Sequence, residues 1–250
     1  MFFDIISSGS KGNSTIVYHN GTVVLIDVGI TNKLLNDELN QFNLNVNDID
    51  ATLITHDHSD HISGIRFIKM SKAYALEGTL PSLGNAIEPF KPFFINDIKI
   101  TAVPTSHDAK NPCGYVLEVD DIKLVYITDT GIIDDETLHY LINPTYLIIE
   151  CNHDISMLLK TNRPAELKDR ILSSYGHLCN EDSASYSCRI VGKKTKEIVL
   201  AHISEEANTP ECALKAYEKV FSYFNIDIHK FKVTVANQHH HYIGGEYNED

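Results

Sequence analysis

The strongest chemical signal in the sequence is an HxHxDH pattern formed by His56, His58, Asp60 and His61, directly after an apolar run at residues 51–55. Imidazole nitrogens and carboxylate oxygens are ligands that zinc, manganese and iron accept. A tight loop can direct His56 and His58 toward one ion while Asp60 and His61 face another. A solvated histidine-rich loop is the alternative, but the position at the end of a strand, where sites are usually built, favours metal binding.

Further candidate ligands stand at the ends of later strands. They are His107 after residues 98–103, Asp129 after residues 123–128, and His202 after residues 197–201. A single histidine after a strand is more often structural than a ligand. Together with the HxHxDH loop, however, the set can complete a cage for two ions.

The elements that must position these residues alternate between strands and helices. The dipeptide Asn20-Gly21 between two apolar runs predicts a hairpin, and Thr209-Pro210 predicts a helix start. We expect strands at residues 2–6, 15–18, 23–27, 51–55, 72–75, 98–103, 115–119, 123–128, 146–150 and 197–201. We expect helices at residues 31–43, 62–70, 163–173, 181–191 and 210–223. This order favours an α/β class, an αββα sandwich of two packed sheets with helices outside.

Composition limits the class of protein. The chain has 250 residues, 43% of them hydrophobic, and a formal net charge of -13. We expect one domain over residues 1–250 with a frayed acidic tail at 246–250. The net charge argues against a broad duplex-binding groove, because phosphate binding requires clustered basic residues, although bound divalent ions would add positive charge locally.

Cysteine usage and the N-terminus indicate a cytoplasmic protein. Five cysteines are scattered without a CxxC pair, which fits reduced thiols. We find no signal peptide and no apolar run long enough to span a bilayer, so we expect no membrane partner. The sequence leaves the oligomeric state open, a homodimer included.

With this order of ligands the sequence resembles the metallo-β-lactamase superfamily, which implies a four-layer αββα fold. The resemblance implies one ion held by His56, His58 and His107, and a second held by Asp60, His61 and His202. It makes Asp129 the bridge between the ions. It also matches Asp27, in the segment Leu25-Ile26-Asp27-Val28-Gly29, to an aspartate that braces the histidine loop. A plain turn aspartate is the alternative for Asp27.

Within the superfamily the sequence resembles the YycJ/WalJ-type bacterial nucleases over roughly residues 1–223. The similar segments are residues 7–14, 106–109, 150–154, 176–182 and 200–211. The resemblance implies a cytoplasmic enzyme that degrades DNA from the 5′ end. Cys151 and Cys179 stand where alanine and serine are expected, and residues 160–164 lack the usual glycine and tyrosine, which bears on specificity more than on the metal cage.

These observations predict a dinuclear metal-dependent phosphodiesterase, a DNA exonuclease, that acts through a metal-bridging hydroxide. Asp60 could also accept a hydrogen bond from that hydroxide. His177 is the candidate for protonating the leaving group, as a histidine that is not a ligand does in the similar tRNA 3′-processing nucleases; a core histidine is the alternative. His153 and Lys11 are candidate substrate contacts, and a solvated loop histidine is the alternative for His153.

Other functions are compatible with the same set of metal ligands. A cyclic nucleotide phosphodiesterase would need no extended basic surface, a thioester or lactam hydrolase uses similar ligands, and a non-enzymatic metal-binding module remains as a different class. The two divalent ions are Zn²⁺ or Mn²⁺, with iron as a further option. For His239, His240 and His241 near the end of the chain we expect a solvated segment without a role.

Overall fold

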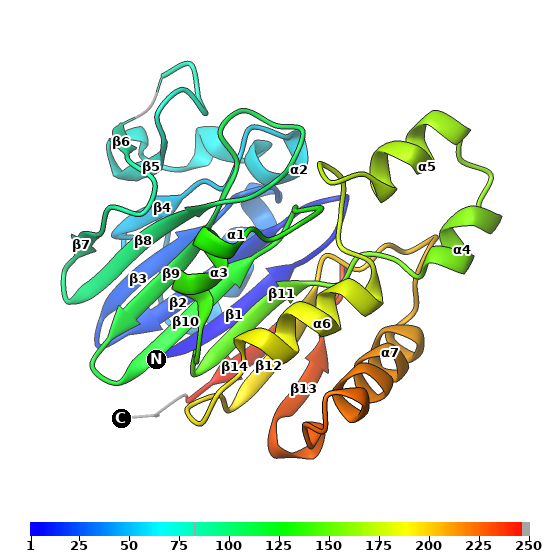
Figure 1. The fold of residues 1–250 in the computed structure, drawn as a ribbon. Coiled ribbons are helices and arrows are strands. Elements are labelled where there is room, and N and C mark those ends of the chain that lie inside the picture. The colour runs from blue at the N-terminus through cyan, green and yellow to red at the C-terminus, as the bar shows by residue number, and fades with distance from the viewer. Residues whose placement is uncertain (83, 247–250) are drawn as a thin grey trace.

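The computed structural model describes residues 1–82 and 84–246 and contains two facing sheets (Figure 1). Within these residues one seven-stranded sheet has the spatial order β14 (Tyr242–Gly245), β1 (Phe2–Ser7), β2 (Ser14–His19), β3 (Thr22–Ile26), β4 (Ala51–Leu53), β5 (Ala73–Leu76) and β6 (Asn85–Ile87). The other has the order β13 (Lys232–Val235), β12 (Glu197–Ala201), β11 (Tyr146–Glu150), β10 (Ile122–Ile127), β9 (Cys113–Val119), β8 (Ile98–Pro104) and β7 (Phe93–Ile95).

The helices lie outside the two sheets, packed on their outer faces or beside them (Figure 1). They are α1 (Asn32–Gln41), α2 (Ser59–Ile62), α3 (Asp135–Leu141), α4 (Ile155–Lys160), α5 (Ala165–Leu172), α6 (Asn180–Ile190) and α7 (Pro210–Tyr223). Leu35 and Leu39 of α1 pack with the outward residues of the first sheet. Tyr217 and Phe221 of α7 pack on the second sheet. The four-layer αββα prediction is therefore confirmed.

The main core lies between the two sheets and follows the alternation of side chains along each strand. In β1, Phe3 and Ile5 point into the space between the sheets, while Ile6 belongs to the layer beneath α1. The predicted hairpin is present: Asn20 and Gly21 have positive φ angles of 46° and 84° between β2 and β3, the conformation that a tight two-residue hairpin turn requires.

The carboxyl ends of the strands that precede the candidate ligands lie along one edge of the sandwich. Strands β3 and β4 are parallel in the first sheet, and β10, β11 and β12 are parallel in the second. Strand β8 points the same way as β10, because β9 is antiparallel to both. The loops that carry the candidate ligands leave from this edge, so the topology gathers residues that are far apart in the sequence.

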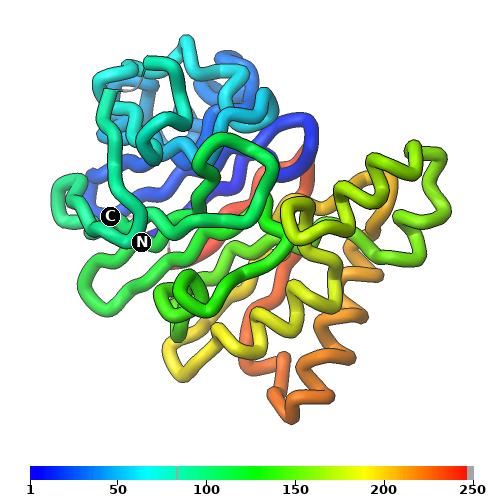
Figure 2. The backbone as a smooth tube through the Cα atoms, turned by 45° about the horizontal axis from the view of Figure 1, so that its top comes forward, coloured from blue at the N-terminus to red at the C-terminus, as the bar shows by residue number. Residues whose placement is uncertain are grey.

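Helices α4 and α5 project from the sandwich beside this edge (Figures 1 and 2). Asp154 caps α4 by accepting a hydrogen bond of 2.7 Å from the Met157 backbone N–H. The predicted helix at 163–173 corresponds to α5, and α4 was not predicted. No helix in the described part of the chain is long and apolar enough to cross a membrane.

One expectation about the helices was wrong. The helix expected at 62–70 is not continuous, since α2 ends at Ile62 and is followed by 3₁₀ turns at Ile65–Phe67 and Met70–Lys72. The apolar spacing of three residues that suggested a helix also suits 3₁₀ turns. The tail expected to fray at 246–250 stays a prediction: the Glu246 backbone N–H donates to the Met1 carbonyl at 3.1 Å, and residues 247–250 lie outside the described residues.

Candidate metal centre and active site

Three candidate site residues lie directly or closely after the end of a strand. The backbone of each of them is in the left-handed region. Asp27, Asp129 and His202 have φ angles of 57°, 54° and 54°. Aspartate tolerates this conformation, whereas for histidine it is uncommon. Such a residue costs about 1–3 kcal/mol and persists where the surrounding structure requires it. The sharp turns direct all three side chains toward the centre of the edge.

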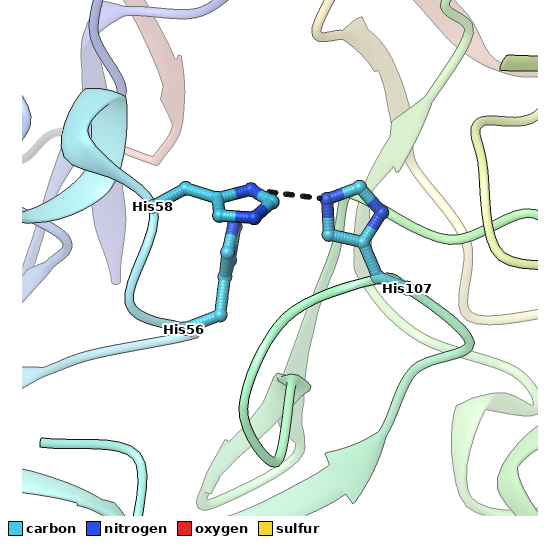
Figure 3. Close-up of side chains that lie close together, drawn as sticks. All are labelled: His56, His58 and His107. Carbon is cyan, nitrogen blue, oxygen red and sulfur yellow. Dashed lines mark hydrogen bonds between the residues drawn. The ribbon is translucent and has the colours of Figure 1, made fainter. Parts of the chain in front are cut away.

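The first group of candidate ligands consists of His56, His58 and His107 (Figure 3). Their nitrogens lie within 4.8 Å of one another, and His58 Nδ1 is 3.3 Å from His107 Nε2. His107 Nδ1 donates to the Gly176 carbonyl at 3.1 Å, which leaves Nε2 free to bind a metal. Since the ring is fixed by a carbonyl oxygen, its tautomer is fixed as well.

Thr55 sets the orientation of His56. The Thr55 hydroxyl donates to Asp27 Oδ2 at 2.8 Å, so its oxygen can only accept from His56 Nδ1, 2.9 Å away. His56 Nε2 then carries no proton. Burial also lowers the pKa of His56 below its usual range, which favours the neutral imidazole that metals bind.

The second group consists of Asp60, His61 and His202, whose ligand atoms also lie within 4.8 Å of one another. His61 Nδ1 donates to Asp27 Oδ2 at 2.7 Å, and His202 Nδ1 donates to Glu150 Oε1 at 2.8 Å. Both rings therefore turn Nε2 toward the interior of the site. This is the arrangement in which a carboxylate orients a metal-binding histidine.

Asp129 lies between the two groups. Its Oδ2 is 3.4 Å from His61 Nε2, and its Oδ1 is 3.9 Å from His107 Nε2. Burial alone would raise the pKa of Asp129, but the surrounding histidines, His202 and His61 first, hold it well below the usual range. Asp129 is thus an ionised carboxylate within reach of both groups.

The residues present fit metal ions. His56 Nε2, His202 Nε2 and Asp129 Oδ2 are buried without a hydrogen-bond partner among the described residues. Buried polar atoms are nearly always partnered, and a metal is the partner that unprotonated nitrogens and a carboxylate share. Burial lowers the pKa of His61 and His202, yet Asp129 and the other carboxylates outweigh this and raise the two values to about 8 and about 10.

A hollow of about 290 Å³ opens beside the first group of ligands and is lined by His107, His177, Asn152, Arg163 and Arg170, among others. The two arginines come from the projecting segment around α5. Both are in exposed ion pairs, Arg170 with Asp108 and Arg163 with Glu206. Exposed pairs of this kind contribute little, so a phosphate could exchange for either carboxylate. The sequence analysis did not identify these arginines.

Comparison with known proteins agrees with this geometry. The β-lactamase superfamily domain matches residues 22–203. The chain is 36% identical over 227 residues to the exodeoxyribonuclease WalJ of Streptococcus pneumoniae, covering 84% of each chain. It is 34% identical over 234 residues to the exodeoxyribonuclease YycJ of Bacillus anthracis, covering 88% of this chain and 89% of that protein.

The chain belongs to the metallo-β-lactamase superfamily, in its YycJ/WalJ family. The metallo-β-lactamase fold protein YhfI of Bacillus subtilis has the same fold, with a TM-score of 0.72 over 97% of this chain and 99% of that chain at 17% identity. The protein is therefore a metal-dependent hydrolase that uses divalent metal cofactors. The number and kind of ions and the role of each ligand stay predictions.

Asp27 contacts the loop that carries the candidate ligands. The side chain is fully buried and accepts from three donors: Thr55 N at 2.8 Å, Thr55 Oγ1 at 2.8 Å and His61 Nδ1 at 2.7 Å. Burial raises the pKa of Asp27 above its ordinary value, against the lowering effect of His61. Its contacts join the strand end to the ligand loop, which a plain turn aspartate would not do.

Glu150 is a further residue of the candidate site that was not predicted from the sequence. Its Oε1 accepts from His177 Nδ1 and His202 Nδ1, both at 2.8 Å, and its Oε2 accepts from the backbone N–H groups of Thr130 and Leu178. Burial raises its pKa, but His177 and His202 lower it to about 2. Because both oxygens are fully engaged, Glu150 acts as a support for the histidines. The feature of the sequence that points to Glu150 is its position at the end of the apolar run 146–150.

His177 and His153 have different surroundings. His177 is 19% exposed at the hollow, with Nδ1 held by Glu150, so Nε2 is the atom available to a substrate. His153 is only 1% exposed, and burial lowers its pKa to about 4. It is therefore not a solvated loop histidine, and its burial gives no support to a substrate contact.

The loop between β1 and β2 supports the ligands through residues that were not assigned to the site. Asn13 Nδ2 lies 3.0 Å from His61 Nε2, and the Ser8 hydroxyl accepts from the His202 backbone N–H at 2.8 Å. Lys11, predicted as a substrate contact, is exposed and pairs with Glu205 at 2.5 Å. It lines a different hollow, next to Gln238 and His239, and its contact with substrate stays a prediction.

Proposed function

We propose that this protein is a dinuclear metal-dependent exodeoxyribonuclease. The observation that carries the proposal is the hollow beside the metal centre, in which His177 and two guanidinium groups line one wall. Cationic and proton-donating groups beside a metal centre suit a phosphodiester, whereas a lactam or thioester brings no negative charge to match them. The identity of 34–36% to exodeoxyribonucleases over most of the chain supports the same substrate class.

In this proposal two groups of residues hold the ions and Asp129 spans them. The groups are His56, His58 and His107, and Asp60, His61 and His202. Two divalent ions held there would polarise the scissile phosphate and activate a water for attack. The bridging hydroxide, and the hydrogen bond that Asp60 would accept from it, stay predictions.

His177 supplies the proton for the leaving group. Its Nδ1 donates to Glu150, which fixes the ring and leaves Nε2 toward the hollow. In its protonated form the His177 ring can donate from Nε2 to a departing alkoxide. Because Glu150 holds both His177 and His202, the proton donor and the second ligand group keep a fixed spacing.

Arg163 and Arg170 bind the phosphate backbone of the DNA on the side of α5. Their present carboxylate partners are exposed, so the exchange for phosphate oxygens is not costly. The ions and the two arginines concentrate positive charge at the site, which a net charge of -13 over the whole chain does not prevent.

The test is hydrolysis of end-labelled DNA, end-labelled RNA and 2′,3′- and 3′,5′-cyclic nucleotides by the metal-reconstituted protein. A His58→Ala variant is the matched control, because it removes one ligand that is partly exposed. Metal-dependent shortening of DNA from one end, lost in the variant, is the expected result. Turnover confined to a cyclic nucleotide would make that nucleotide, and not DNA, the substrate. Turnover of thioesters or lactams alone would contradict the assignment as a phosphodiesterase.

A further inference from the structure

A second cluster of possible ligands lies away from the active site, around Asp4 in the middle of β1. The Asp4 side chain is 0% exposed, and neither carboxylate oxygen has a hydrogen-bond partner among the described residues. A buried carboxylate is normally paired or bound to a metal. Burial raises the pKa of Asp4 to about 6 even though the neighbouring His241 lowers it, so the charge is poorly compensated.

The position of Asp4 on its strand explains this burial. Phe3 and Ile5 point between the sheets, so Asp4 points to the opposite face, toward the layer under α1. Leu35 and Leu39 of α1 are buried in that layer. A carboxylate buried on this side of the sheet requires a specific partner.

Two side chains from distant parts of the chain approach Asp4. His241, just before β14, places Nδ1 3.4 Å from Asp4 Oδ1 and 3.2 Å from Glu38 Oε2 of α1. The three ligand atoms all lie within 4.8 Å of one another. The Gln41 amide also donates to Glu38 Oε2, which orients that carboxylate. Strand β14 pairs with β1 along this stretch, with Asp4 opposite Ile243 (Figure 1).

The distances and charges match a bound ion better than an ion pair. Charge-assisted hydrogen bonds between nitrogen and carboxylate are about 2.7–2.9 Å long, shorter than the 3.2 and 3.4 Å found here. Ligands bound tetrahedrally to zinc at their usual bond lengths are about 3.3–3.4 Å apart. Two carboxylates and a neutral imidazole also carry the charge that balances one divalent cation.

We propose that Asp4, Glu38 and His241 bind one divalent metal ion, of which zinc fits the donor set best. The ion ties together β1, α1 and the segment before β14. The same segment carries Gln238, whose amide donates to Ser7 Oγ at 2.7 Å and to the Gly12 carbonyl at 3.0 Å. The site is structural: it holds the C-terminal segment against the loop that supports the catalytic ligands. His239, His240 and His241 are exposed, as expected from the sequence, and in this proposal His241 also binds the ion.

The test counts ions. The full chain is stripped of metal, loaded with Zn²⁺, dialysed, and its zinc content measured by mass spectrometry. His241→Gln is expected to bind one zinc ion fewer than the wild-type chain. His240→Gln is the matched control, because His240 is an exposed neighbour outside the cluster, and it is expected to bind the wild-type number. The difference does not depend on how many ions the active site holds.

Two further measurements test the proposed metal site. Asp4→Asn is expected to lose the same single ion, and a zinc-loaded crystal is expected to give an anomalous peak between Asp4 Oδ1, Glu38 Oε2 and His241 Nδ1. Equal zinc content in wild type, His241→Gln and folded Asp4→Asn would overturn the proposal and leave an ion pair. His241→Gln that keeps DNA hydrolysis but loses one zinc would support it independently of the nuclease assignment.

Discussion

Glu150 Oε1 accepts a hydrogen bond of 2.8 Å from Nδ1 of His177, and the same oxygen accepts one from His202. A single buried carboxylate therefore couples the proposed proton donor to a proposed metal ligand. A Glu150→Gln substitution keeps the shape of the side chain. Its neutral amide, however, lacks the negative charge of the carboxylate that accepts both N–H groups. We expect activity to fall about 10–100-fold, the usual effect of losing a partner of a metal ligand, as measured by steady-state hydrolysis. Unchanged activity in a folded variant would contradict this coupling.

His177 is predicted to act on the leaving group and not on metal binding. His177→Ala should lower kcat about 100-fold to 10,000-fold, the range for losing a general acid, with metal content equal to that of the wild type. His139→Ala, an exposed histidine on α3, is the control and should change neither quantity. Loss of metal together with activity would instead make His177 a ligand.

Asp27 is predicted to control metal affinity. Asparagine in its place cannot accept from Thr55 N, Thr55 Oγ1 and His61 Nδ1 together. Asp27→Asn should weaken metal binding about 10–100-fold, measured by competition with a chelator. Asp50→Asn is the control, because Asp50 also accepts from a backbone N–H, that of Val23, outside the active site. Equal metal affinities for the two variants would remove the proposed role of Asp27.

Arg170 is predicted to contact substrate phosphate. Arg170→Ala should raise KM about 10-fold or more, since a hydrogen bond to a charged group contributes about 1.5–3 kcal/mol, and it should reduce the salt dependence of binding by about one phosphate contact. Arg189→Ala is a matched control, with 48% against 50% exposure and an aspartate partner in both cases. An equal effect of both substitutions would indicate a general charge effect.

Asp4 is predicted to destabilise the metal-free protein at neutral pH. Burial raises its pKa in the folded state from 3.8 to about 6, so the folded protein binds this proton more tightly than the unfolded chain does. The contribution of protonated Asp4 to the free energy of unfolding is therefore present at acid pH. It is lost as the pH rises from about 4 to about 6. The charged and titratable groups beside Asp4 are Glu38 and His241.

The measurement is thermal unfolding in the presence of chelator at about pH 5 and about pH 8. Asp4→Asn should raise Tm relative to wild type more at the higher pH, by at least about 2 °C, because 1 kcal/mol shifts Tm by about 2–4 °C in a chain of this size. Adding zinc should reverse the order, since only the wild type gains the ion. A Tm difference that does not vary with pH would contradict the raised pKa.

The architecture could be predicted because its signals are local. Asn20-Gly21 sets a hairpin, and Thr209 caps α7 by accepting from the Cys212 N–H at 3.2 Å. The predicted ligands also lie together, since the parallel strands bring their carboxyl ends to one edge. The helix expected at 62–70 was wrong because Ile62, Ile65 and Ile68 recur every three residues, which suits two kinds of helix.

Residues that depend on contacts between distant segments could not be predicted. Glu150 ends an ordinary buried strand, and only the structure brings it to two histidines. Arg163 and Arg170 reach the active site because α4 and α5 project beside it (Figure 2). Asp4 and His241 meet through the register of β1 and β14, which no short motif encodes.

The most direct test of the central claim compares linear DNA with covalently closed circular DNA of the same sequence. The metal-loaded wild-type protein is incubated with each, and released mononucleotides are measured beside the His58→Ala variant. The account predicts mononucleotides from linear DNA, none from closed circles, and none with the variant. Cleavage of closed circles, or no release from linear DNA by metal-loaded protein, would contradict an exonuclease.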